Sequence, residues 1–194
     1  MTEQELIARA KAGDDEAFAQ LMRANETRIY NLTLRMTGNP EDAMDLAQEA
    51  FLNAWRGLKF FKGDSAFSTW VYRLASNACI DFLRRKKRRQ DVSLSMPTDE
   101  EDDSQPDIPD ERFLPERELE RKELRQAVAA GLSQLSDEHR QVLVMREING
   151  LSYQEIADVL DLVAGTVKSR IARARNSLRK ILLKSGNFSD PPSS

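Results

Sequence analysis

Residues 152–184 constrain the fold of this chain more than any other stretch. Ser152 stands three residues before Glu155, which is the spacing of a capping box and predicts the start of a helix. Residues 161–163 interrupt the apolar pattern of that helix, and a second helix is expected from about Ala164. Two short helices joined by a tight turn form a helix-turn-helix unit, so the sequence predicts one in the C-terminal part of the chain.

The second of these helices carries charge of one sign. Between Ala164 and Lys184 there are seven Lys or Arg and no Asp or Glu. Short polar side chains flanked by cations suit a major groove between two phosphate backbones, which favours DNA binding over an amphipathic helix with a solvated basic face. At helical spacing the residues that point away from the apolar face are Ser169, Ala172, Arg173 and Asn176, with Lys168, Arg170 and Arg175 on its flanks.

The net charge of −3 does not by itself suggest a nucleic-acid partner, but the charges are unevenly distributed. Residues 1–90 carry 15 basic and 12 acidic side chains and residues 119–194 carry 12 and 9, whereas residues 91–118 carry 2 and 11. The middle segment also holds four prolines, so it is predicted to be a flexible linker between two mildly basic domains. Its adjacent acids at 99–103 do not predict a metal site, because they cannot converge on an ion without other ligands.

The composition is that of a soluble globular protein, with 40% hydrophobic and 31% charged residues. Apolar residues recur at helical spacing over much of the chain, and an all-α fold of two small domains is predicted. Cys79 is the single cysteine, and its helical surroundings predict a packed thiol. The N-terminus shows no export signal and no apolar run is long enough to span a membrane, so we expect a cytoplasmic protein without membrane insertion.

Residue types that carry enzyme chemistry are sparse. His139 is the single histidine, and it falls in a predicted loop between two helices. The sequence holds no Gly-rich phosphate loop, Cys–His pair or cluster with metal-ligand spacing. We therefore expect no catalytic residues, no metal and no cofactor.

The helix predicted over residues 40–58 has an alanine-rich apolar side and a polar side with one leucine in its middle. A single exposed apolar residue is common on protein surfaces and needs no explanation. An acidic stripe with one central apolar side chain also describes a docking surface for a basic partner helix. The outward residues of this helix are Asp45, Gln48, Glu49, Leu52 and Arg56.

A loop rich in Phe, Gly and Ser at 59–69 precedes a helix predicted over 69–85 and a basic run at 84–89. Single-stranded nucleic acid requires flat rings for stacking, amides that contact base edges and cations for the backbone. The alternative is a set of core aromatics followed by a solvated basic helix end. The residues expected to point outward are Arg73, Ser76, Asn77 and Ile80, with Trp70 and Tyr72 at the margins.

Four stretches resemble the bacterial RNA polymerase sigma factors of the extracytoplasmic-function group. They are DLAQEAFLNAW at 45–55, FSTWVYRLASN at 67–77, GLSYQEIA at 150–157 and GTVKSR at 165–170. The similarity covers nearly the whole chain in order, apart from the acidic linker and the tail. The resemblance implies sigma domain two at residues 1–90, a linker at 91–118, sigma domain four at 119–185 and a tail at 186–194.

For domain two, the resemblance implies binding to the clamp helices of the largest subunit of core RNA polymerase. The residues assigned to this contact are Asp45, Gln48, Glu49 and Leu52. A base flipped from the minus-ten non-template strand would enter a pocket formed by residues 63–68 and the helix that bears Asn77. The residues assigned to minus-ten DNA are Lys62, Gly63, Asp64, Ser65, Phe67, Trp70, Arg73, Ser76 and Asn77.

For domain four, the resemblance implies contacts to the minus-thirty-five major groove and to the beta flap of the polymerase, and it makes an anti-sigma factor a further expected partner. The residues assigned to minus-thirty-five DNA are Arg146, Thr166, Lys168, Ser169, Ala172 and Arg173, with Arg170 and Arg175 on phosphates. The chain departs from the family at Asp161, often Gly, and at Val163, usually Pro. Asp can adopt the left-handed conformation and Val163 only loses a pre-set helix start, so the fold should survive.

A free-standing helix-turn-helix regulator that binds an operator is the principal alternative. Such proteins usually dimerise to read paired half-sites, and no heptad repeat marks a dimer interface in this chain. The basic, aromatic segment at 60–89 would also have no role. The predicted function is therefore that of a sigma factor, which binds core RNA polymerase, recognises both promoter elements, promotes strand opening and initiates transcription.

Overall fold

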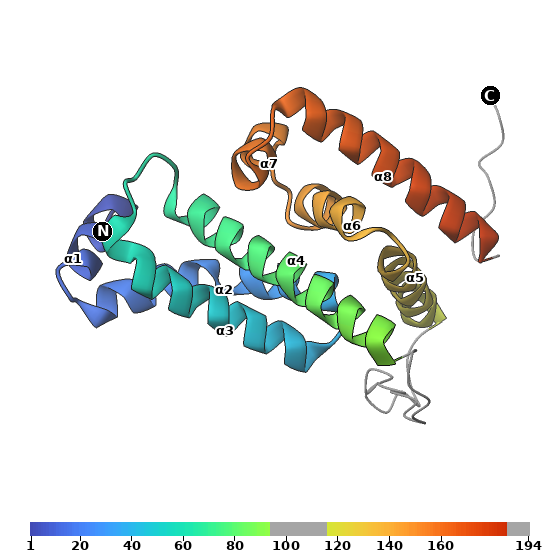
Figure 1. The fold of residues 1–194 in the computed structure, drawn as a ribbon, viewed down its shortest axis with the longest axis horizontal. Helices are drawn as coiled ribbons and strands as arrows, with labels where there is room; N and C mark the ends of the chain where they lie inside the picture. The colour runs from blue at the N-terminus through green and yellow to red at the C-terminus, as the bar shows by residue number, and fades with distance from the viewer. Residues whose placement is uncertain (94–115, 186–194) are drawn as a thin grey trace.

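The computed structural model describes the backbone of residues 1–93 and 116–185 and the side chains of residues 1–89 and 122–185. The N-terminal group consists of α1 (Glu3–Lys11), α2 (Asp15–Thr37), α3 (Pro40–Gly57), the 3-10 turn η1 (Leu58–Phe60) and α4 (Phe67–Ser93). The C-terminal group consists of α5 (Glu116–Ser133), α6 (Asp137–Leu143), the π-helical turn η2 (Val144–Ile148), α7 (Tyr153–Leu160) and α8 (Ala164–Lys184) (Figure 1). No strand occurs within the described backbone, and the predicted all-α fold with a C-terminal helix-turn-helix is confirmed.

The helix that precedes the predicted linker is longer than the sequence pattern suggested, since it continues to Ser93 and does not end at Arg85. α5 begins at Glu116, so it includes the last three residues of the predicted linker. Lys and Arg are good helix formers, so the basic run at 84–89 continues α4 instead of ending it. The rest of the predicted linker, residues 94–115, and the tail at 186–194 lie outside the described residues.

Capping residues set the bounds of the helices. Ser152 caps α7 as predicted, since its hydroxyl accepts a hydrogen bond from the Glu155 amide at 3.1 Å. The Ser152 amide in turn donates to the Glu155 carboxylate at 2.7 Å, which completes the capping box and lowers the pKa of Glu155. At the other end of α7, Asp161 adopts the left-handed conformation with φ 54°, as its position led us to expect.

Small side chains and a cluster of aromatic rings hold the N-terminal group together. The alanines of α3 and α4 that have no exposed surface are Ala43, Ala50, Ala54 and Ala75, and they allow close packing of α2, α3 and α4. The ring of Phe61 stacks on Trp70 with centroids 4.8 Å apart, and Phe18 packs against Trp55 at the same distance. The edge of Phe67 meets both Phe18 and Phe61, so the cluster fixes the start of α4 against α2 and α3.

In the C-terminal group, α8 packs on α5, α6 and α7 through its apolar side. Val167, Ile171 and Ala174 of α8 are buried, as the sequence pattern predicts. Gly131 of α5 permits the close approach of the other end of α8. A Cβ atom at Gly131 would lie 2.9 Å from the side chain of Leu182.

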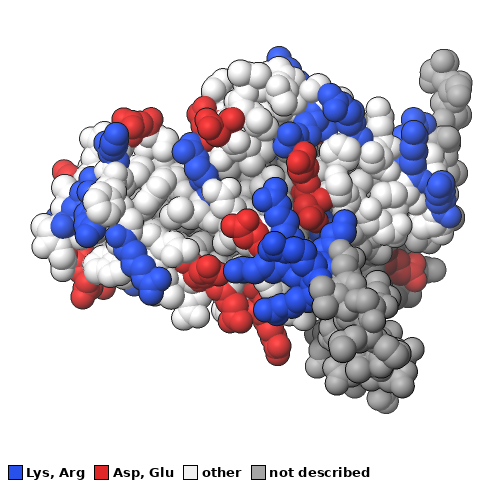
Figure 2. Space-filling model, in the orientation of Figure 1, with Lys and Arg blue, Asp and Glu red and all other residues white. Residues whose placement is uncertain are grey.

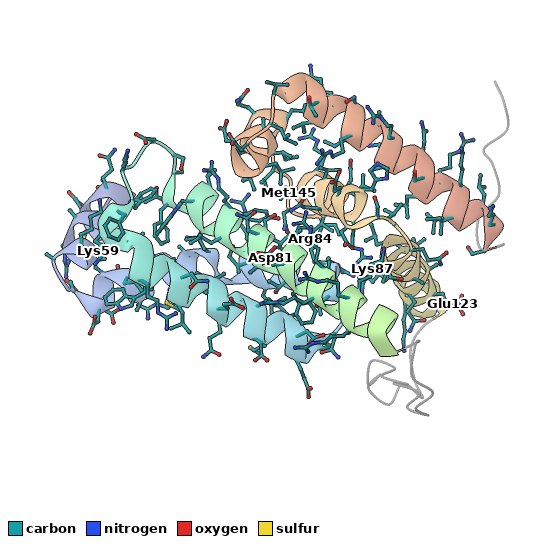
Figure 3. The ribbon with its side chains drawn as sticks, in the orientation of Figure 1. Lys59, Asp81, Arg84, Lys87, Glu123 and Met145 are labelled. Atoms are coloured by element: carbon teal, nitrogen blue, oxygen red, sulfur yellow. The ribbon has the colours of Figure 1, made fainter. Side chains whose placement is uncertain are left out.

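The two groups also pack against each other. α4 contacts α6 and α7, and α2 contacts α5, α6 and η2, whereas α8 lies on the side of the C-terminal group that faces away from α4 (Figure 1). Met145 of η2 has no exposed surface, and Figure 3 shows it among the side chains between the two groups. The arrangement is therefore closed, with the outward face of α4 against the C-terminal group.

Arg140 of α6 connects the ends of two helices that belong to different groups. Its guanidinium donates to the carbonyl of Leu132 at 2.9 Å and to that of Ser133 at 2.7 Å, in the last turn of α5. It also donates to the carbonyl of Met36 at 2.6 Å, in the last turn of α2. Burial lowers the pKa of Arg140, but the converging carbonyls at the negative ends of two helix dipoles favour a cation.

We expect Arg140→Met to destabilise the protein by about 3 kcal/mol, because it leaves several carbonyls in a buried position without donors. The free energy of unfolding from urea titration measures the change. Arg35→Met, at an exposed position beside Met36, is the control and should change stability by less than about 0.5 kcal/mol. Equal losses in the two variants would show that the helix-end contacts do not matter.

Candidate nucleic-acid and polymerase interface

The outer face of α8 is a continuous polar and basic surface, in the phase that the sequence predicts. Lys and Arg gather along α8 and over the second half of α4 in Figure 2. Thr166 is half-buried at the start of the helix, and its carbonyl accepts a hydrogen bond from the Ser169 hydroxyl at 2.9 Å. The exposed residues of this surface are Lys168, Ser169, Ala172, Arg173, Arg175 and Asn176. These side chains are accessible to DNA, and their contact with DNA stays a prediction.

Both arginines assigned to phosphates are already engaged within the protein. Arg170 lies 3.4 Å from the carboxylate of Glu138, at half-buried depth. Arg175 forms an ion pair of 2.6 Å with Glu147, which raises the pKa of Arg175. Glu147 precedes Arg175 by 28 residues, so no local pattern in the sequence could have identified the pair.

Arg146 lies beside the helix-turn-helix, as expected. Its side chain already contacts Leu151 and Tyr153 of the protein itself. Its guanidinium donates to the carbonyl of Leu151 at 2.8 Å and lies over the ring of Tyr153, 4.8 Å from the centroid. Lys168 of α8 lies 5.8 Å from the centroid of the same ring. Tyr153 therefore positions two predicted DNA contacts, a role that the sequence pattern did not indicate.

The α3 stripe, which we define as Asp45, Gln48, Glu49 and Leu52, is exposed over its full length. Met44 and Trp55 of the same helix are also exposed large apolar residues, and sequence reasoning missed both. Next to the stripe, an apolar groove of about 660 Å³ runs between α2 and α3. The groove is lined by Ala19, Met22, Arg23, Glu26, Thr27, Tyr30, Met44, Ala47, Gln48 and Phe51.

The loop at 61–66 is exposed for most of its length after the buried Phe61, and it bounds a hollow against α1. Lys62, Gly63 and Asp64 are exposed, Ser65 is half-buried, and Gly63 has φ 83°, a conformation that favours glycine. A hollow of about 600 Å³ lies between this loop and α1. Its walls come from residues 3–11 and 61–66, and the pocket expected between the loop and the helix that bears Asn77 stays a prediction.

Two aromatic residues assigned to minus-ten DNA belong to the core cluster. Phe67 has 0% of its surface exposed, so its predicted contact with DNA does not fit the structure. Trp70 is half-buried, and its ring stacks on Phe61 and packs over Gly57. The reason is that Phe61 and Phe67 fill the space between α2, α3 and α4, which is the alternative that the sequence left open, whereas Phe60 is 73% exposed.

The outward face of α4 is covered by the C-terminal group, which the sequence pattern could not reveal. Ser76 was expected to point outward but is only 1% exposed, and its hydroxyl accepts a hydrogen bond of 2.5 Å from the Gln141 amide. Arg73 donates to the carbonyl of Asp158 in α7, while its Nε atom is buried without a partner. Asn77 stays exposed at the edge of the contact. The helical spacing thus predicted in which direction these side chains point. It could not predict that the C-terminal group packs against them.

The basic run of α4 is solvent-exposed for most of its length. Arg84 and Lys87 extend from the second half of the helix in Figure 3. Lys86 lies 3.6 Å from Asp42 of α3, and Arg84 lies 3.9 Å from Asp81, which are distances typical of weak surface pairs. The run therefore offers cations to a partner.

Among the residues that the structure describes, no group of His, Cys, Asp and Glu side chains could hold a metal ion. In the same residues no helix is both long and apolar enough to cross a membrane. Cys79 is buried, and burial raises the pKa of its thiol to about 12. A thiol in this environment is protonated at neutral pH, in agreement with the packed role expected for it.

Comparison with known proteins assigns both groups to one family. The family models for Sigma-70 region 2 and for Sigma-70, region 4 match residues 21–89 and 125–178. The RNA polymerase sigma-H factor of Pseudomonas aeruginosa is 39% identical over 184 residues, which cover 93% of each chain. The ECF RNA polymerase sigma factor SigW of Bacillus subtilis is 38% identical over 176 residues, which cover 91% of this chain and 94% of SigW.

Two solved structures share the fold. CnrH, in complex with the cytosolic domain of CnrY, matches with a TM-score of 0.68 at 27% identity and covers 94% of this chain and 97% of its own. The sigma factor RpoE of Bartonella quintana, in complex with the anti-sigma factor NepR, matches with a TM-score of 0.66 at 22% identity. This match covers 86% of this chain and 96% of RpoE.

The exposed basic helix-turn-helix and the two matched Sigma-70 regions place the chain in the class of DNA-binding transcription proteins. The chain is a member of the extracytoplasmic-function group of RNA polymerase sigma factors, as the identity to SigW and the two Sigma-70 regions show. Sigma factors are transcription initiation factors. The family recognised from the four sequence stretches is thereby confirmed.

The turn between α7 and α8 yields a stability prediction. We expect Asp161→Val to destabilise the protein by about 1–2 kcal/mol, because a β-branched residue disfavours the left-handed conformation at this position. Asp161→Gly is the matched variant and should not be destabilised, since glycine adopts this conformation without strain. Urea unfolding measures both. A valine variant as stable as the glycine variant would contradict the account.

Proposed function

We propose that the chain binds core RNA polymerase, directs it to promoters with minus-thirty-five and minus-ten elements, and promotes strand opening. The single observation that carries this proposal is the exposed basic face of α8 on a helix-turn-helix, in a chain whose other part matches Sigma-70 region 2. Residues 1–90 would act as domain two and residues 119–185 as domain four. The proposal assigns the protein no enzymatic activity of its own and places it in the cytoplasm with the polymerase.

We assign recognition of the minus-thirty-five element to the outer face of α8. The exposed side chains of Lys168, Ser169, Ala172 and Arg173 can reach base edges in a major groove. The guanidinium of Arg173 is planar and exposed, which suits bidentate contact with guanine. Arg170 and Arg175 would contact phosphates at the flanks, after exchange of their present carboxylate partners.

We assign core binding to the α3 stripe and capture of the minus-ten strand to the loop at 61–66 and the outward face of α4. The stripe offers acids around an apolar side chain, as the clamp helices of the largest subunit would require. The loop offers Lys62 to the nucleic-acid backbone, and α4 offers the exposed Asn77 to bases. Arg73 and Ser76 would contact bases after exchange of their present partners in the C-terminal group. The beta flap of the polymerase is the partner that we propose for domain four.

An anti-sigma factor is a further partner that we propose. The Bartonella RpoE was solved with the anti-sigma factor NepR, and CnrH with the cytosolic domain of CnrY. The apolar groove between α2 and α3, next to the α3 stripe, offers a surface where an inhibitor would exclude the polymerase.

Run-off transcription with added core RNA polymerase tests the proposal directly. A template library with random sequence upstream of a constant reporter allows active promoters to be selected from the pool and then sequenced. We expect specific transcripts only when both core and the chain are present. Binding to DNA without any stimulation of transcription would instead support an operator-binding regulator.

Leu52→Asp should reduce the affinity for core RNA polymerase at least about tenfold, because an apolar anchor at the centre of an interface contributes more than its neighbours. Leu124→Asp is the control, since Leu124 is 49% exposed and Leu52 47%. Affinity is measured by fluorescence anisotropy with labelled chain. The proposed docking role fails if both variants bind as the natural sequence does.

Arg173→Ala should reduce discrimination at one position of the minus-thirty-five element by about 1–3 kcal/mol. Arg175→Ala should weaken binding to all sequences more evenly and only slightly, because Glu147 already engages this arginine. Selection from a randomised duplex library measures base preference for each variant. An unchanged preference in Arg173→Ala would mean that another face of α8 contacts the bases.

A further inference from the structure

We propose that α1 is a clamp that holds both ends of the loop at 61–66 and so positions this loop for capture of the minus-ten strand. The inference rests on the proposed function, which gives the loop its role. The match to Sigma-70 region 2 begins at residue 21, so it assigns no role to α1. Glu3 and Lys11, the first and last residues of α1, are the positioning residues of the clamp.

Lys11 holds the start of the loop. Its ammonium donates a hydrogen bond of 2.5 Å to the main-chain carbonyl of Phe61 and lies 5.8 Å from the centroid of the Phe61 ring. That ring is buried and stacks on Trp70, so the side chain and the carbonyl of Phe61 are both fixed. A charged donor also forms a stronger hydrogen bond than a neutral one. The backbone therefore enters the loop in a set direction.

Glu3 holds the end of the loop, where α4 begins. Its carboxylate accepts a hydrogen bond of 3.1 Å from the Phe67 amide, the first amide of α4. α4 has no acidic residue in its own first turn, and the side chain of Ala66 before it cannot accept a hydrogen bond. A carboxylate at a helix start satisfies an amide that has no partner within the helix, and the helix dipole favours it. Glu3 thus supplies, from 64 residues away, a cap that the local sequence lacks.

The middle of the loop depends on these two anchors. Within the described part of the chain, the backbone of residues 62–65 makes no hydrogen bond. Lys62, Gly63 and Asp64 are exposed and accessible to a partner. A short loop between two fixed ends has few conformations, whereas release of one end allows many more. The clamp therefore lowers the entropy that the loop loses when it binds a single strand.

α1 is itself held in place, so it can serve as a fixed support beside the loop (Figure 1). Ala10 is buried, and Leu6 and Ile7 pack against the core. An ion pair of 2.6 Å between Arg9 and Asp14 joins the end of α1 to the start of α2. These contacts do not involve the loop, so substitutions at its two anchors leave them intact.

Glu3→Ala separates positioning from simple charge. Removal of an acid beside nucleic acid ordinarily strengthens binding, because it removes a repulsion from the phosphates. The clamp predicts the opposite sign, with single-strand affinity reduced about fivefold because the loop loses an anchor. Glu3→Gln keeps an oxygen that accepts from Phe67 and should bind at least as tightly as the natural sequence. Gln4→Ala is the matched control, since Gln4 is exposed on the same helix and lines the same hollow.

Lys11→Met gives a second, independent measurement at the other anchor. It should reduce single-strand affinity about fivefold, and Lys11→Arg should recover most of the loss because it keeps a charged donor. Direct contact of Lys11 with a phosphate would make the slope of log affinity against log salt shallower by about 0.7 in Lys11→Met. The clamp leaves this slope unchanged, since Lys11 is engaged by the Phe61 carbonyl.

The measurements use holoenzyme assembled from core RNA polymerase and the full-length chain. The probe is a labelled single strand, selected beforehand from a randomised pool with the natural sequence, and anisotropy measures its affinity for each variant. A duplex selected in the same way is the reference, and its affinity should be unchanged. In the free chain, hydrogen exchange over residues 61–68 should become faster in Glu3→Ala and Lys11→Met and not in Gln4→Ala.

Single-strand binding by Glu3→Ala that equals or exceeds that of the natural sequence would overturn the proposal, and so would unchanged hydrogen exchange. If Glu3→Ala misfolds and loses duplex affinity, Lys11→Met decides, and undiminished single-strand binding by it contradicts the clamp. Run-off transcription separates this result from the proposed function. If the natural sequence neither transcribes nor selects a strand, the proposed function is wrong, and hydrogen exchange alone decides whether α1 holds the loop. If all variants transcribe and bind the strand alike, only the clamp is wrong.

Discussion

The relation between the two helical groups depends on one buried guanidinium. Every helix ends with carbonyls that have no partner within it, and the ends of α2 and α5 bring such carbonyls to the same place. Arg140 supplies donors to both ends. A lysine in this position has a single nitrogen and could not span two helix ends in the same way. The position of α6 is thus set in part by main-chain geometry, together with buried apolar residues such as Met145.

This mode of packing suits a surface that has a second partner. A face of α4 that contacts nucleic acid must be polar, and an apolar cover would leave its groups unsatisfied. The C-terminal group places two polar side chains opposite this face. Gln141 donates to Ser76, and Asn149 donates to Tyr72. The apolar residues near the contact, such as Met145, lie where the groups meet α2. The same protein can therefore bury the α4 face without making that burial permanent.

The sequence predicted most of the fold, because caps and apolar periodicity are local signals. The capping box at Ser152, the left-handed Asp161 and the exposed stripe around Leu52 all follow from neighbouring residues. The sequence did not predict burial that depends on residues far apart in the chain. The burial of Ser76 depends on a residue 65 positions away, and nothing around Phe67 distinguishes a stacking ring from a core ring. The relation between the groups could not be predicted, because Arg140 bonds to the two helix ends through main-chain carbonyls, which leave no pattern of side chains.

The internal partners of Arg170 and Arg175 change how binding should respond to ionic strength. DNA affinity falls with salt in proportion to the number of phosphates that a protein neutralises, since each one releases condensed counterions. An arginine that moves from a carboxylate to a phosphate neutralises the phosphate but leaves the carboxylate without its partner. The exposed carboxylates of Glu138 and Glu147 then lose their arginine partners beside the DNA and attract cations back from solution. The salt dependence of α8 binding should accordingly be shallower than its count of basic residues implies, so that recognition relies more on base contacts than on net charge.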